Sequence, residues 1–156
     1  MIYVGIDPGK RGGLGFLDGG HAWGDWVDTT DGSAIRVHLR DLEAKDVIVG
    51  IEVPVGRPPQ HGGWKQISQQ WRAIGVAEGV VMGLGLPLVR VSPKDWRRLV
   101  EIRQPKNETY EQGKKRVLAA ARQRWPQAGL DRVKDQPIAD ALYIAASLAG
   151  KGKEEA

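Results

Sequence analysis

The chain has 156 residues and a formal net charge of +4, and it contains no cysteine. A chain of this length can bury its own core as one domain, and without thiols it forms neither disulfides nor thiolate metal sites. No apolar run approaches the length of a membrane span and the first residues lack the layout of a signal peptide, so we expect a cytoplasmic protein.

The opening segment predicts a strand that ends in a carboxylate. Residues 2–6 read as a short β-strand, and Asp7-Pro8-Gly9 stops it. An aspartate at the carboxyl end of a strand lies where open α/β folds place their ligands, so Asp7 is a candidate metal ligand. The same residue also suits a simple turn, because aspartate before Pro-Gly is common in turns.

The next segments predict an antiparallel meander and a second acidic strand end. Residues 12–17 and 21–27 read as two strands around a Gly-containing hairpin turn. Residues 33–44 have helical spacing, and the apolar run at 47–51 reads as a buried strand that ends at Glu52. A buried strand leading into an unpaired glutamate is costly unless the charge has a partner, so Glu52 is a second candidate ligand.

Residues 53–65 form a loop that is rich in proline and glycine and carries basic and aromatic residues. Loops of this length within compact domains are usually functional. Trp64 suits either an exposed residue that stacks on or wedges between bases, or a hydrophobic lid over the sheet. His61 is a weaker candidate for positioning a phosphate.

A helix is predicted at about residues 66–84, and it has glycine at every fourth position, at Gly75, Gly79 and Gly83. Each glycine costs up to about 1 kcal/mol in a helix interior, so this stripe implies that another backbone approaches closely. Either the helix packs tightly on its own sheet, or it meets its twin across a two-fold axis.

A fifth strand is predicted at residues 88–91. Ser92 then suits an N-cap and Pro93 a first helical position, so Lys94 lies just past the strand end. Positive charge is concentrated in this part of the chain. Residues 90–124 hold eleven Lys or Arg against four Asp or Glu, a net of +7, so the rest of the chain sums to −3. Such a block suits a polyanion, nucleic acid above all, although a solvated helix face is the simpler reading. The candidate DNA-binding residues are Arg57, Trp64, Lys65, Arg97, Arg98, Lys106, Lys114 and Lys115.

The last two long helices are predicted at 107–124, with Asn107 as the cap, and from about Pro137 onward. Asp140 lies in the first turn of the final helix, where it would favour the helix dipole. Its position beside alanines on a strongly apolar element argues against a purely surface role. Asp135 stands just before this helix, as an N-cap or as a further metal ligand.

The predicted order of elements gathers these carboxylates in one place. The first and fourth strands would be neighbours in a mixed sheet, so the carboxylates at their ends and at the start of the last helix would repel one another unless cations neutralise them. Two Mg²⁺ or Mn²⁺ ions held by such oxygens would activate a water and stabilise the leaving oxygen in phosphodiester cleavage. The residues alone therefore predict an oxygen-ligated metal nuclease that acts on a polyanion.

Over essentially its whole length the sequence resembles the RuvC-type Holliday-junction resolvases of the RNase H-like superfamily. The matching pieces are Gly5-Ile6-Asp7-Pro8-Gly9, Ile51-Glu52, Ser92-Pro93-Lys94 and Ala139-Asp140-Ala141-Leu142-Tyr143-Ile144-Ala145. The resemblance implies an α/β RNase H-like fold with a five-stranded mixed sheet, in which strands 1–3 are antiparallel and strands 4–5 are parallel, flanked by helices. We expect a single nuclease domain over residues 1–150 and a charged tail over 151–156.

The resemblance also implies a homodimeric, Mg²⁺-dependent endonuclease of bacterial or phage origin that nicks four-way DNA junctions, with Asp7, Glu52 and Asp140 as ligands of two ions. It implies that the 66–84 helix builds the dimer interface. Lys94 would approach the scissile phosphate, and Trp64 is the nearest candidate for an aromatic wedge.

One position departs from the family pattern. Bacterial members carry Asp or His three residues before the last aspartate, and this chain has Pro137 there, which cannot be a ligand. Asp135 is our substitute as the fourth catalytic carboxylate.

Two other functions stay open. The Asp-Pro-Gly followed by Lys-Arg-Gly-Gly also resembles the opening of RuvX-type nucleases that act on RNA. A non-catalytic RNase H-like module that only binds nucleic acid is the other alternative. The glycine stripe and the Pro-rich loop with Trp64 favour the junction nuclease.

Overall fold

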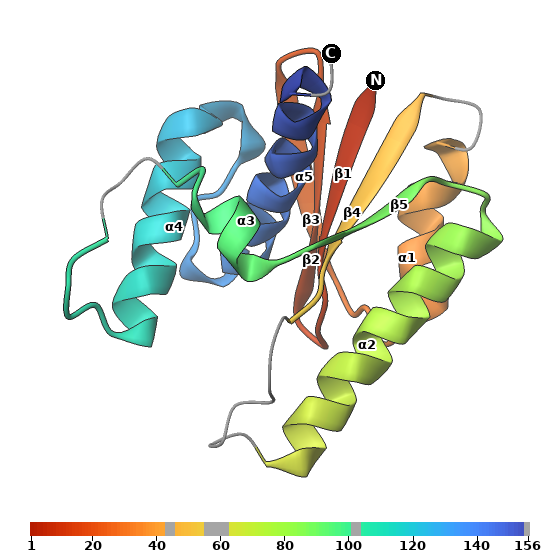
Figure 1. Ribbon diagram of the computed structural model, residues 1–156, viewed down its shortest axis with the longest axis horizontal. Coiled ribbons are helices and arrows are strands. Elements are labelled where there is room, and N and C mark those ends of the chain that lie inside the picture. The colour runs from red at the N-terminus through yellow and green to blue at the C-terminus, as the bar shows by residue number, and fades with distance from the viewer. Residues whose placement is uncertain (43–45, 55–62, 101–103, 155–156) are drawn as a thin grey trace.

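The computed structural model describes residues 1–42, 46–54, 63–100 and 104–154, the last four without their side chains. Figure 1 shows a central sheet with helices on both faces. The sheet has the strand order β3-β2-β1-β4-β5, with β2 antiparallel to β1 and β3, and β4 parallel to β1 and β5. The predicted fold class is confirmed. The strands are β1 (Ile2–Asp7), β2 (Gly12–Asp18), β3 (His21–Val27), β4 (Val47–Glu52) and β5 (Leu88–Val91).

One face of the sheet is covered by α1 (Gly32–Leu39), a short 3-10 helix (Arg40–Leu42) and α2 (Trp64–Gly83) (Figure 1). Alternate residues of β1, namely Ile2, Val4 and Ile6, are buried in this layer, as the two-residue period of a strand requires. The helices bring their own buried residues into the same layer: Ile35, Leu39, Ile74, Ala77 and Val81.

On the opposite face α5 (Gln136–Glu154) lies on the sheet, and α3 (Pro93–Arg97) and α4 (Tyr110–Arg124) pack against α5. The backbone of α5 lies directly on β1 and β2, because a Cβ atom on Gly5 would collide with the carbonyl oxygen of Ala141, and one on Gly13 with that of Pro137. These contacts set α5 antiparallel to β1. The first turns of α5, which carry Asp140, therefore lie at the carboxyl end of β1.

Most predicted helix boundaries agree with the structure. Ser92 caps α3, and Pro93 is its first residue, as predicted. The predicted Asn107 cap of α4 is wrong, because Thr109 caps the helix and forms a capping box with Gln112. Helix α5 runs to Glu154 and so includes residues 151–154 of the segment that we expected to be a tail. No helix among the described residues is long and apolar enough to cross a membrane.

The glycine stripe of α2 faces away from the sheet. Gly75, Gly79 and Gly83 are exposed, and a Cβ on any of them would meet no described atom within 4 Å. Trp71 and Met82, on the same side of the helix, are 49% and 69% exposed. The alternative in which these glycines pack on their own sheet is therefore wrong.

Candidate active site

Two strand ends place Asp7 and Glu52 side by side. Ile6 of β1 is the register partner of Ile51 of β4, and both strands run in the same direction, so the next residue of each strand lies at the same edge of the sheet. Asp140 reaches this edge from the first turns of α5. All three side chains are partly buried.

The three carboxylates act on one another electrostatically. Burial raises the pKa of Asp7 well above its usual range, and the negative charges of Asp140 and Glu52 raise it further, against the positive charges of Lys114 and Arg97. Burial likewise raises the pKa of Asp140 to about 7, together with the charge of Glu52. These groups are therefore close enough for their ionised forms to destabilise one another.

Each of two carboxylates is oriented by one hydrogen bond from a neighbouring helix. The indole Nε1–H of Trp96 in α3 donates to Oε2 of Glu52 at 2.5 Å, and the amide Nε2–H of Gln136 in α5 donates to Oδ1 of Asp140 at 2.9 Å. Trp96 is only 2% exposed and stacks on Tyr143 with 6.2 Å between ring centroids, so its donor is held rigidly. Burial raises the pKa of Glu52, while the Trp96 hydrogen bond and the charge of Arg97 act in the opposite direction.

The three carboxylates are the type of ligand that suits a hard divalent cation. Asp7, Glu52 and Asp140 offer only carboxylate oxygens, the ligands that Mg²⁺ prefers, and a cation would remove the repulsion that raises their pKa values. Among the described residues no three Asp, Glu or His side chains already form a metal-binding group.

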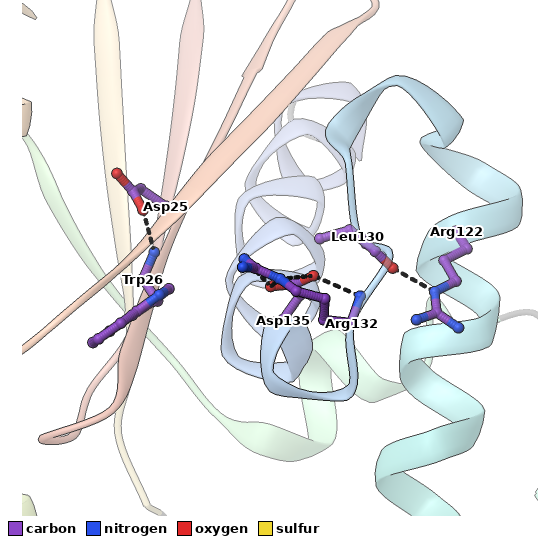
Figure 2. A network of polar contacts seen from close by, with 6 residues as sticks. All are labelled: Asp25, Trp26, Arg122, Leu130, Arg132 and Asp135. Atoms are coloured by element: carbon purple, nitrogen blue, oxygen red, sulfur yellow. Dashed lines mark hydrogen bonds and ion pairs between the residues drawn. The ribbon is translucent and has the colours of Figure 1, made fainter.

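The structure does not bring Asp135 to this cluster. Its side chain is fully buried and accepts hydrogen bonds from Arg132, from the backbone N–H to Oδ2 at 2.8 Å and from a guanidinium N–H to Oδ1 at 2.9 Å (Figure 2). Burial would raise the pKa of Asp135, but the bonds and charge of Arg132 outweigh it and lower the pKa. Asp135 closes the 3-10 helix Val133–Asp135 that leads into α5, so we leave it out of the proposed ligand set.

The fold has counterparts among solved structures. The sequence itself matches no protein-family model and no curated protein. The structure of Thermus thermophilus RuvC in complex with a Holliday junction substrate is similar over 99% of this chain and 96% of that one, at 18% identity and a TM-score of 0.67. A second T. thermophilus RuvC structure is similar over 99% and 97%, at 19% identity and a TM-score of 0.65. This chain has the RuvC fold.

Within this RuvC fold, two of the predicted DNA-binding cations lie near the carboxylates. The charges of Arg97 in α3 and Lys114 in α4 both lower the pKa values of Asp7 and Asp140. Lys94 is exposed at the start of α3, and its charge is not among those that shift these carboxylates.

The remaining predicted contact residues are mostly on the surface. Trp64, the first residue of α2, is 84% exposed, so its alternative as a lid over the sheet is wrong. Arg57 and His61 lie outside the described residues. Exposed side chains also include Lys65, Arg98, Lys106 and Lys115.

Two residues that orient the carboxylates of this RuvC-like site, Trp96 and Gln136, were not among the predicted site residues. Trp96 had a usable signal, since a tryptophan buried next to a strand-end glutamate needs an acceptor for its N–H. Gln136 lies one helical turn before Asp140, a spacing at which side chains meet. Both signals become specific only once the neighbouring element is known.

Proposed function

We propose that this protein is a structure-selective endonuclease that resolves four-way DNA junctions by Mg²⁺-dependent phosphodiester hydrolysis as a homodimer. The observation that carries the proposal is the cluster of Asp7, Glu52 and Asp140, three partly buried and mutually repelling carboxylates at the carboxyl edge of a RuvC-like sheet. The first of the two similar structures is, by its title, a RuvC bound to a Holliday junction substrate.

In this proposal the chain's own residues hold and orient the reacting groups. Asp7, Glu52 and Asp140 are the metal ligands, and Trp96 and Gln136 hold the last two in place. Divalent ions at these oxygens would supply an activated water and stabilise the leaving oxygen.

The basic side chains of α3 and α4 supply the attraction for the DNA backbone. Arg97 and Lys114 lie near enough to the carboxylates to act on their charge, so they also suit a phosphate placed there. Lys94, exposed one helical turn before Arg98, remains a candidate for a neighbouring phosphate. Trp64, exposed at the start of α2, remains the proposed wedge at the junction centre.

The exposed side of α2 supports the homodimer. Its glycines cost helix stability although a Cβ atom at each of them would meet no described atom within 4 Å, and Trp71 and Met82 expose apolar surface beside them. A second copy of the same helix would cover this surface and use the close approach that the glycines permit.

A cleavage assay on a synthetic four-way junction, with and without Mg²⁺, tests the proposal. We expect paired nicks that need Mg²⁺, and we expect Asp7→Asn, Glu52→Gln or Asp140→Asn to abolish them while junction binding persists. Asp131→Asn is the matched control, since Asp131 is an exposed aspartate away from the cluster. Mg²⁺-dependent cutting that survives in any of the three ligand variants would refute the site.

The same assay separates the two alternatives. An RNA substrate cut in preference to the junction would favour the RuvX-type reading. Binding to branched DNA without any cleavage, by the wild-type protein and by Asp7→Asn alike, would favour a non-catalytic module.

A further inference from the structure

A cavity of about 600 Å³ lies beside the end of β1, on the side of the sheet opposite the carboxylates. The turn after β1, the segment between β3 and α1, and the first turns of α2 line it. Its lining includes three glutamines of α2, Gln66, Gln69 and Gln70, and two cations, Lys10 and Arg72. None of these residues belongs to the proposed metal site.

The glutamines have hydrogen-bonding capacity that the protein does not use. No hydrogen bond joins the side-chain amides of Gln66, Gln69 and Gln70 to any other part of the chain that the structure describes. Each primary amide offers two donors and an acceptor, the pattern that pairs with the edge of a nucleobase. Three such amides along one wall of a cavity are therefore suited to the edge of a base.

The cavity carries net positive charge toward a ligand. Lys10 and Arg72 are exposed cations in its wall. The lining carboxylate, Asp28, accepts hydrogen bonds at Oδ1 from the backbone N–H and the hydroxyl of Thr30 at 2.9 and 2.5 Å. These bonds and the charge of Lys10 lower the pKa of Asp28, so its charge offsets one of the two cations and leaves the lining with a net charge of +1. The two cations can therefore meet a phosphate attached to the base in the cavity.

The part of the cavity wall that lies nearest the carboxylates is held in place by hydrogen bonds between Thr29 and Gly9. Thr29 is fully buried, and its hydroxyl accepts from the N–H of Gly9 at 2.7 Å and donates to the carbonyl of Gly9 at 3.1 Å. Gly9 stands two residues after Asp7 and directly before Lys10. A DNA strand that crosses the end of β1 can thus touch the carboxylates on one side and enter the cavity on the other.

We propose that this cavity binds one unstacked nucleotide of the DNA strand that is cut, with its phosphate at Lys10 and Arg72 and its base edge at the glutamines. The inference rests on the proposed junction-nuclease function and adds a nucleotide subsite to it. The volume lies within the range of small-molecule pockets. A merely solvated helix face would explain the exposed amides, but it would not explain why they line one wall of a cavity that also has two cations.

Fluorescence of 2-aminopurine tests the subsite without any cleavage. The base analogue is placed in turn at each position around the centre of a junction, and the junction is bound to the inactive Asp7→Asn variant. We expect emission to rise at one position, because unstacking removes the quenching, and we expect Gln69→Ala with Gln70→Ala to reduce the rise by about half or more. Gln123→Ala, on the exposed end of α4, is the matched control and should leave the rise unchanged.

Cleavage rates give the second readout. Cleavage is measured with each of the four bases in turn at the position where emission rises. The wild-type rates should differ by about tenfold between the best and the worst base. In the glutamine variant, which carries Gln69→Ala and Gln70→Ala, this difference should fall to about threefold or less. A thermal melt by circular dichroism verifies that the glutamine variant is folded.

The outcomes separate the two proposals. If the wild-type protein cuts junctions but no position brightens, or the glutamine variant keeps both the emission rise and the full spread of rates, the subsite does not exist. If the wild-type protein neither binds nor cuts any junction, the proposed function itself fails.

Discussion

The charge of Asp140 should make the metal-free protein less stable at neutral pH. The pKa of this carboxyl is raised from 3.8 to about 7, mainly by burial. Between these values the folded protein binds the proton more tightly than the unfolded chain does, so the free energy of unfolding falls as the pH rises through this window. At about 1.36 kcal/mol for each pH unit, the full effect is at most about 4 kcal/mol.

Asp140→Asn removes the charge and keeps a side-chain oxygen that can accept the hydrogen bond from Gln136. Without metal at about pH 8 we expect the variant to be more stable than the wild type by about 2–4 kcal/mol, a rise in Tm of about 5–15 °C. Near pH 4 the wild-type carboxyl is protonated in the folded protein, and the two Tm values should approach each other.

Thermal melts followed by circular dichroism in EDTA, from about pH 4 to pH 8, measure this difference. Asp131→Asn should behave like the wild type, since Asp131 is exposed. Saturating Mg²⁺ should close most of this difference, because an ion at a concentration of 100 Kd stabilises the protein that binds it by about 2.7 kcal/mol. Wild-type stability that rises with pH through this window, or a variant that gains nothing in EDTA at pH 8, would refute the reasoning.

Three other substitutions test separate parts of the structure. Trp96→Phe keeps the buried ring but removes the donor to Glu52, so Mg²⁺ affinity measured by calorimetric titration should fall about 10- to 100-fold. Asp135→Ala removes the acceptor of Arg132 and should lower the free energy of unfolding by about 1–3 kcal/mol in urea melts, with Mg²⁺-dependent cleavage retained; lost cleavage in a folded variant would return Asp135 to the site. A Cβ atom at Gly79 would meet no described atom within 4 Å, so Gly79→Leu should convert a dimer to a monomer by light scattering without a loss of helicity; an unchanged mass would place the interface elsewhere.

Much of the fold could be predicted because local and global signals agree. The two-residue period of β1, the apolar run of β4 and the stop signals after Asp7 and Glu52 define strands whose ends carry the two carboxylates. The N-cap of α4 was mispredicted because Asn107 and Thr109 are both good cap residues and stand two positions apart. The deciding signal is Gln112, which stands three residues after Thr109 and completes the capping box.

The site was only partly predictable, because the position of a residue in the sequence does not show which other residue its side chain contacts. Asp135 and Asp140 look alike in the sequence as acidic residues around the start of α5. Arg132 holds Asp135 through local hydrogen bonds in the lead-in to the helix, while Asp140 has Gln136 one turn before it and faces the strand ends. A preceding arginine able to neutralise Asp135 therefore distinguishes the structural carboxylate from the candidate ligand.

The carboxylate cluster depends on glycines that take no part in binding or catalysis. Gly5 and Gly13 lack the side chains that would hold α5 away from the sheet, and the contact at Ala141 fixes the height of the helix above β1. This close packing places Asp140 near Asp7 whether or not a cation is present, so the repulsion between them is built into the fold. The buried apolar layer of α5 must outweigh that repulsion in the metal-free protein, and ion binding then relieves it. A site assembled in this way gains cation affinity at the expense of metal-free stability.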